Sequence, residues 1–118
     1  MHSLCDSLPP AIAAYVSATN RGDLDALVGQ FVPDALVNDQ LREHWGCEAI
    51  RTWAERDIIG ERLTIKVLGL VRHYRQIILT SAIDGEFDKR GLPDPLLFTF
   101  YFALNDDKIV QLVILPGQ

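Results

Sequence analysis

Apolar residues in the first part of the chain recur at the spacing of amphipathic helices. A first helix is predicted to begin at Pro9 and Pro10, where a missing N–H costs nothing, and to end at Gly22. Its apolar stripe repeats at i, i+3, i+4 and i+7 and consists of Ile12, Tyr15, Val16 and Thr19. Asp23 is a good N-cap for a second, short helix, whose stripe consists of Leu24, Leu27, Val28 and Phe31.

The next stretch, from Pro33 to Ile58, predicts a short strand, a polar loop and a third helix. Pro33-Asp34 is expected to stop the second helix, and residues 35–38 form the strand. The polar loop contains Asp39, His44 and Trp45. The third helix begins near Gly46, and the apolar residues that recur at helical spacing are Ile50, Trp53 and Ala54. An acid at a strand end, beside an imidazole and an indole, predicts the floor of a pocket.

After Gly60 the apolar period changes from 3.6 to 2, which indicates strands. Four strands are predicted, separated by turns rich in Gly, Pro, Asn and Asp, over residues 63–71, 77–87, 96–104 and 108–115. Helices followed by hairpin-linked strands indicate an α+β domain. We expect three N-terminal helices packed on one face of a strongly curved antiparallel sheet, with the last two strands at its centre.

Two of these strands carry apolar residues on both faces. Residues 63–71 include Leu68 and Leu70 on the second face, and residues 96–104 alternate phenylalanines with Thr99, Tyr101 and Ala103. A monomer rarely exposes so large an apolar patch, and a closed two-fold dimer is the commonest remedy. We therefore predict a homodimer that forms through the sheet face left uncovered by the helices.

The composition indicates one domain and argues against two kinds of partner, nucleic acid and membrane. With 118 residues and 48% hydrophobic side chains, the chain is expected to fold as one domain, residues 1–118. Its 11 Lys and Arg are scattered, and 16 Asp and Glu give a net charge of -5. Because backbone binding requires a basic footprint, no nucleic-acid partner is expected. No segment approaches the ~20 apolar residues of a membrane span, so no membrane partner is expected either.

The remaining signals concern compartment and cofactors. The N-terminus lacks the basic and apolar regions of a signal peptide. Cys5 and Cys47 lack metal-ligand spacing and are interpreted as free thiols in a reducing cytoplasm, with a disulfide between them as the alternative. No trio of His, Cys or carboxylates has metal-ligand spacing, and no Gly-rich phosphate loop is present. We therefore expect a cytoplasmic protein without metal or nucleotide cofactor.

A family resemblance rests on four segments that occur in order. After a helix that buries a tyrosine, the chain reads NRGDLDAL, then FVPDALVND, then WGCEAIRTW, and it closes on NDDKIVQLVI. This series resembles the SnoaL-like and ketosteroid-isomerase-like members of the nuclear transport factor 2 (NTF2-like) superfamily over nearly the whole chain. The resemblance implies a cone of helices and sheet around a pocket. It does not imply one activity, because this fold hosts isomerases, dehydratases, cyclases, epoxide hydrolases and proteins without chemistry.

The resemblance also assigns roles to two residues. Asp39 matches the general base of the isomerase-like members, and Tyr15 matches the tyrosine that donates to the developing oxyanion. Ketosteroid isomerase adds a protonated Asp as a second donor. Here Phe100 stands at the matching position, and no acid occurs between Pro95 and Leu104. Since one oxyanion donor contributes ~2.7 to 4 kcal/mol in other enzymes, steroid isomerisation is not expected.

Each candidate also has a simpler interpretation. Asp39 could only cap a turn, Tyr15 could only belong to the core, and His44 could be a solvated loop residue or could relay a proton with Asp39. The candidate pocket walls, which are otherwise core residues, are Trp45, Trp53, Phe98, Phe100 and Phe102.

Two classes of function remain. One is proton transfer, of isomerase, cyclase or dehydratase type, on a hydrophobic carbonyl compound. The other is a binding or dimeric interaction module without turnover.

Overall fold

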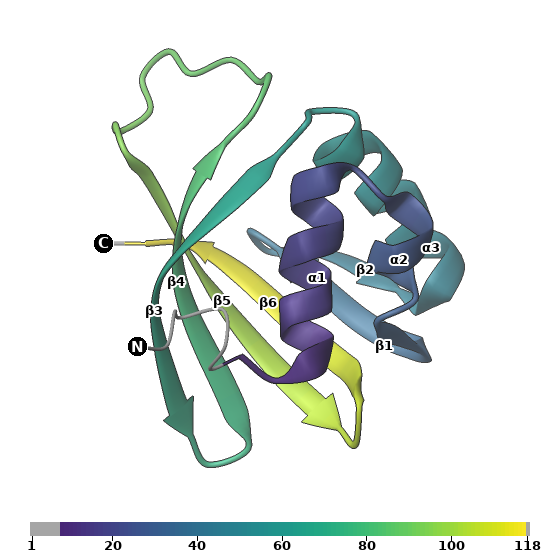
Figure 1. Cartoon of the computed structure of the whole chain (residues 1–118). Helices are drawn as coiled ribbons and strands as arrows, with labels where there is room; N and C mark the ends of the chain where they lie inside the picture. The colour runs from purple at the N-terminus through teal and green to yellow at the C-terminus, as the bar shows by residue number, and fades with distance from the viewer. Residues whose placement is uncertain (1–7, 118) are drawn as a thin grey trace.

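A layer of helices on one face of a six-stranded sheet makes up the fold (Figure 1). The computed structural model describes residues 8–117. Its helices are α1 (Pro10–Arg21), α2 (Leu24–Val28) and α3 (Gly46–Trp53), and α3 continues into one π-helical segment, η2 (Ala54–Ile59). The strands are β1 (Phe31–Asp39), β2 (Arg42–Trp45), β3 (Thr64–His73), β4 (Gln76–Asp84), β5 (Leu96–Asn105) and β6 (Lys108–Pro116). The predicted α+β class with three helices is confirmed.

The sheet is mixed, with strand order β2-β1-β6-β5-β4-β3. β1 runs parallel to β6, with Asp39 opposite Ile114, whereas every other pairing is antiparallel. The fully antiparallel sheet expected from the sequence is therefore wrong at one pairing, because β6 returns beside the N-terminal β1. β5 and β6 occupy the predicted centre. The sheet is not strongly curled, in contrast to the strong curvature expected, since an alternating pattern predicts pairing and carries no information on bending.

The first hairpin differs from its predicted form. β1 begins at Phe31, four residues before the predicted strand, and β2 replaces most of the predicted loop. Pro33 and Asp34 lie where the β1–β6 register shifts, between Phe31 and Leu36. A proline is tolerated in a strand at such an irregularity, because no ladder hydrogen bond is lost there. The Pro-Asp pair is thus a feature of the strand and not of a helix end.

The helix boundaries follow from local chemistry. Asp23 caps α2, where its Oδ1 accepts the Ala26 N–H at 3.1 Å. Gly22 takes a left-handed φ of 69° at the end of α1, as predicted. η2 ends at Gly60, where a Cβ would lie 2.7 Å from the Arg56 carbonyl oxygen. Any residue larger than glycine at this position would therefore push the end of η2 away from the site that it helps to form.

The core lies between α1, α3 and the inner face of the sheet. Tyr15, Trp53, Phe102, Leu79 and Leu112 are all 1% exposed or less. Full burial of one such large side chain stabilises a fold by about 1.5–3 kcal/mol. Within residues 8–117, no helix is both long and apolar enough to cross a membrane.

The half-buried positions on the outer face of strands β4, β5 and β6 are uncharged, and the exposed Asp84 continues the same row at the end of β4. These half-buried outward positions alternate with buried ones and are paired across the strands. They are Ile78, Thr80, Ala82, Leu97, Thr99, Tyr101, Ala103, Gln111, Val113 and Leu115. We call this set the outer sheet face. No described helix covers it (Figure 1).

Candidate functional site

A cavity of about 560 Å³ opens between the helices and the inner face of the sheet. This volume lies within the range of small-molecule sites. Its apolar wall is built by β3, β4, β5 and the loop between β4 and β5. The principal side chains of this wall are Ile65, Ile83, Phe87, Leu92, Phe98 and Phe100.

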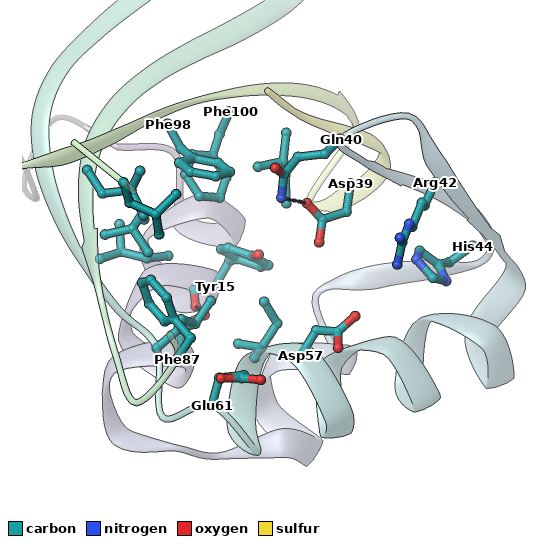
Figure 2. A pocket seen from close by; sticks show the side chains of 18 residues that line it. Tyr15, Asp39, Gln40, Arg42, His44, Asp57, Glu61, Phe87, Phe98 and Phe100 are labelled. Carbon is teal, nitrogen blue, oxygen red and sulfur yellow. Dashed lines mark hydrogen bonds between the residues drawn. The ribbon is translucent and has the colours of Figure 1, made fainter. Parts of the chain in front are cut away.

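The polar wall lies opposite, as Figure 2 shows. The hairpin of β1 and β2 contributes Asp39, Gln40, Arg42 and His44, while Asp57 and Glu61 come from η2 and the turn after it. Tyr15 of α1 lies between the two walls (Figure 2). The polar wall thus carries three carboxylates and one guanidinium.

Asp39 is the last residue of β1, and its carboxylate accepts hydrogen bonds on both oxygens. The indole Nε1–H of Trp53 donates to Oδ2 at 2.9 Å, and the amide Nε2–H of Gln40 donates to Oδ1 at 3.2 Å. Neither donor is charged, and Asp39 forms no ion pair with any residue in the described range 8–117. The carboxylate is thus half-buried and anchored by neutral donors, which suits a proton acceptor.

Tyr15 brings a hydrogen-bond donor to the same space. The residue is 1% exposed and packs edge-on against Phe100 and Phe102, with ring centroids 6.4 and 5.5 Å away. Its hydroxyl has no hydrogen-bond partner within residues 8–117. Burial, followed by the negative charge of Asp39, raises the pKa of the Tyr15 hydroxyl well above its usual value. The group therefore stays protonated at neutral and alkaline pH and can only donate to an anionic oxygen.

Asp57 differs from Asp39 in its partner. The guanidinium of Arg56 donates to it through Nε and Nη2, each at 2.9 Å. This hydrogen bonding, assisted by the charges of Arg56, His44 and Arg42, lowers the pKa of Asp57 below its usual value. Asp57 is consequently ionised at neutral pH and cannot act as the second oxyanion donor.

His44 does not contact Asp39 as the relay hypothesis required. Its ring lies 5.9 Å from the Trp53 ring with a 30° interplanar angle, so it packs against the indole. The side chains that donate to the Asp39 carboxylate are those of Trp53 and Gln40. His44 still lines the cavity and brings its ring nitrogens to the polar wall.

Three of the candidate wall residues do not line the cavity. Trp45 is 63% exposed, because side chains alternate along β2 and the neighbouring positions Arg42 and His44 face inward. Trp53 is fully buried beneath Asp39, and Phe102 lies under α1 against Tyr15. Among the phenylalanines, Phe98 and Phe100 lie at the cavity surface.

Several contributors to the cavity were missed from the sequence, among them Arg42, Asp57, Glu61 and Phe87. Asp57 and Glu61 are four residues apart, a spacing that places side chains on one helix face and offered a usable signal. Arg42 lay in a segment interpreted as a loop. Phe87 was expected in a strand, yet β4 ends at Asp84 and the following loop carries Phe87 to the cavity.

No metal centre accompanies this site in the part of the chain that the structure covers, since no three His, Cys, Asp or Glu side chains there are grouped to hold an ion. Cys47 is exposed and free, and Cys5 lies outside the described residues.

Comparisons of the sequence alone with known proteins find no relative. No family profile matches the chain, and no curated protein is recognisably similar to it in sequence.

Solved structures are similar over almost the whole chain. A candidate polyketide cyclase from Sinorhizobium meliloti superposes with a TM-score of 0.83 and 27% identity over 94% of this chain and 98% of its own. A hypothetical protein from Catenulispora acidiphila has a ketosteroid-isomerase-like fold and bound trimethylamine. It superposes with a TM-score of 0.76 and 18% identity over 91% of this chain and 85% of its own.

A third structure is SalBIII, an epoxide hydrolase/cyclase-like enzyme of pyran ring formation in the polyether salinomycin. It gives a TM-score of 0.74 and 20% identity over 92% of this chain and 88% of its own. Together with the element order and the sheet topology, these similarities show that the chain has the NTF2-like fold in its ketosteroid-isomerase-like form.

Proposed function

We propose that this protein binds a hydrophobic carbonyl compound in the cavity and transfers a proton at the carbon next to the carbonyl. The observation that carries the proposal is the pairing of an anionic acceptor, Asp39, with an unpartnered donor hydroxyl, Tyr15, on one apolar cavity. The structural similarity to a candidate polyketide cyclase and to an epoxide hydrolase/cyclase-like enzyme supports a ring-forming or isomerising reaction on such a compound.

The proposed step is a balanced proton transfer. Asp39 accepts the proton from carbon, the C–H electron pair moves into the C–C bond, and the carbonyl π electrons move to oxygen. Tyr15 donates a hydrogen bond to the resulting enolate oxygen, where negative charge develops. The enolate then takes the proton back from Asp39 at carbon. Alternatively, its carbon attacks a second carbonyl carbon of the same substrate, whose π electrons move to oxygen; that oxygen takes the proton from Asp39, and a ring is closed.

A binding protein without turnover is the second candidate. Phe100 lies on the cavity wall beside Tyr15, where the resemblance would place a second donor, and a phenyl ring cannot donate to an oxyanion. The loss of one donor weakens stabilisation of the enolate by a factor of ~10² to 10³ in comparable sites. This argument favours a slow enzyme or a pure ligand-binding protein over a fast isomerase.

Hydrogen–deuterium exchange separates these two candidates. We expect the protein to accelerate exchange at the carbon next to the carbonyl of 2-tetralone or 1-decalone in D₂O, followed by NMR. Saturable ligand binding without faster exchange would establish the binding protein and overturn the enzyme. Absence of both binding and exchange across such ketones would overturn both.

Replacement of Tyr15 by Phe tests the donor. We expect kcat for exchange to fall by about 10²- to 10³-fold, because the enolate oxygen loses its only tyrosine donor. The hydroxyl has no partner in residues 8–117, so the free energy of unfolding should change by less than about 1 kcal/mol. A Tyr15→Phe variant with unchanged kcat would assign Tyr15 to the core alone.

The charges of the polar wall predict which ligands are excluded. Asp39, Asp57 and Glu61 outnumber Arg42, so an anionic ligand meets net repulsion. We expect 2-naphthoate to bind about tenfold more weakly than the neutral 2-naphthalenemethanol, measured by calorimetry at neutral pH. Replacement of Glu61 by Gln should narrow this difference. Equal affinities for the two ligands would show that Arg42 dominates the wall.

We also propose that two copies of the chain associate through the outer sheet face. The face is uncharged and rich in Ile, Val, Leu and Tyr, so a second copy leaves no charge unpaired when the two faces meet. A two-fold pairing is self-complementary and closes, which prevents further growth.

A further inference from the structure

We infer that Trp53 is the positioning residue of the site: its indole N–H holds Oδ2 of Asp39 and leaves Oδ1 as the atom that accepts the proton. This inference rests on the proposed function, which assigns the base role to Asp39. The sequence pattern had suggested a different part for Trp53, as a wall against which substrate packs.

The two donors on Asp39 are unequal. Trp53 is fully buried, and its hydrogen bond to Oδ2 is 2.9 Å long. The indole donor is shielded from solvent by the core, so we expect this bond to persist whether the cavity is empty or filled. Gln40 is exposed and donates to Oδ1 at 3.2 Å from the cavity rim (Figure 2). A substrate or a water molecule can replace that amide, which frees Oδ1 and not Oδ2.

The indole is itself held in place from two sides. Trp53 is the last residue of α3, where the α-helix widens into the π-helical segment η2. Its side chain is fully buried in the core below β1. The His44 ring packs against it at 5.9 Å from the β2 side. Rotation of the indole would break both contacts, so its N–H direction is fixed before any ligand binds.

An anchored base is effective because distance and direction control proton transfer. A misplacement of about 1 Å can cost ~10²-fold in rate. A bond from a neutral N–H to a carboxylate is strong, yet it adds no positive charge beside the acceptor as an Arg or Lys would. Trp53 thus restricts the orientation of the Asp39 carboxylate without placing a positive charge beside Oδ1.

The first test reads the hydrogen bond without any substrate. The chain contains two tryptophans, so a ¹⁵N-labelled sample gives two indole N–H signals. We expect Asp39→Asn to shift the Trp53 signal and to leave unmoved that of Trp45, which is 63% exposed and serves as the internal reference. Failure of the Trp53 signal to move would overturn the inference.

The second test separates positioning from packing. We expect Trp53→Phe to lower kcat for ketone exchange by about 10- to 100-fold while KM changes less than threefold, as is typical for partners that orient a catalytic group. Benzothienylalanine at position 53 replaces only the N–H by sulfur and should reproduce the loss even if Trp53→Phe folds poorly. Leu27→Ala, which removes core volume outside the cavity lining, is expected to keep wild-type kcat.

The outcomes keep this inference distinct from the proposed function. A shifted indole signal together with no exchange activity in the wild-type protein would refute the proposed reaction while the hydrogen bond stands. Full kcat in the benzothienylalanine protein would refute the positioning role while the proposed reaction stands. A proportional loss of kcat in Leu27→Ala would show that core stability, and not the indole donor, controls the rate.

Discussion

The Asp39→Asn variant should reduce proton exchange on a bound ketone to the rate of the buffer alone, a loss of at least about 10³-fold. General-base catalysis contributes ~10² to 10⁴-fold, and an amide oxygen cannot take up the proton. The variant should remain folded, because the Asn side-chain oxygen can still accept the Trp53 N–H that binds Oδ2 of Asp39. The measurement is kcat by NMR-detected exchange, with circular dichroism to verify folding.

Asp34→Asn is the matched control for this variant. Asp34 lies on the same strand, is exposed and is absent from the cavity lining, so the same chemical change there should leave kcat unaltered. Exchange that persists at the wild-type rate in Asp39→Asn would remove the base role from Asp39. Glu61, whose carboxylate also faces the cavity, would then be the next acceptor to test.

The second large effect concerns assembly. We expect the wild-type protein to sediment at micromolar concentration with twice the 13.2 kDa mass of the chain, and Tyr101→Arg to sediment at 13.2 kDa. Tyr101 lies in the middle of the outer sheet face, between Ile78 and Val113. Two symmetry-related guanidinium groups buried there would be desolvated and would repel each other, which costs several kcal/mol.

Thr52→Arg provides the control for assembly. It adds the same charge on the exposed surface of α3, opposite the outer sheet face, and should leave the mass at twice 13.2 kDa. A wild-type protein that sediments at 13.2 kDa would contradict the dimer directly. If Tyr101→Arg also retained wild-type ketone exchange, the cavity would function in each copy independently.

The helical layer could be predicted from sequence because its signals are local. The stripe of α1, the Asp23 cap and the Gly22 ending each depend on residues within two turns of one another. The parallel pairing of β1 with β6 joins segments more than seventy residues apart, and no local pattern specifies it. The widening of the helix at Ala54 also leaves no mark in the apolar period.

The candidate site was accessible to sequence reasoning only in part. Asp39 and Tyr15 were named because family resemblance aligned them, and both line the cavity. The sequence offered His44 as one partner of Asp39, whereas the side chains that bind its carboxylate are Gln40 and an indole fourteen positions away. An apolar residue at a helical core position carries no sequence signal that its single N–H is aimed at a carboxylate.

The place of β6 in the sheet has a consequence for biosynthesis. Asp39 is held in register by Ile114, and β1 has no other neighbour on that side, so the backbone of Asp39 cannot be fixed until β6 is inserted. During synthesis, the first hairpin keeps an open edge until residues 108–116 are available to pair with it. Such long-range closure slows folding and exposes the nascent chain to aggregation. A translational pause before residue 108 would therefore be expected to lower the yield of native protein.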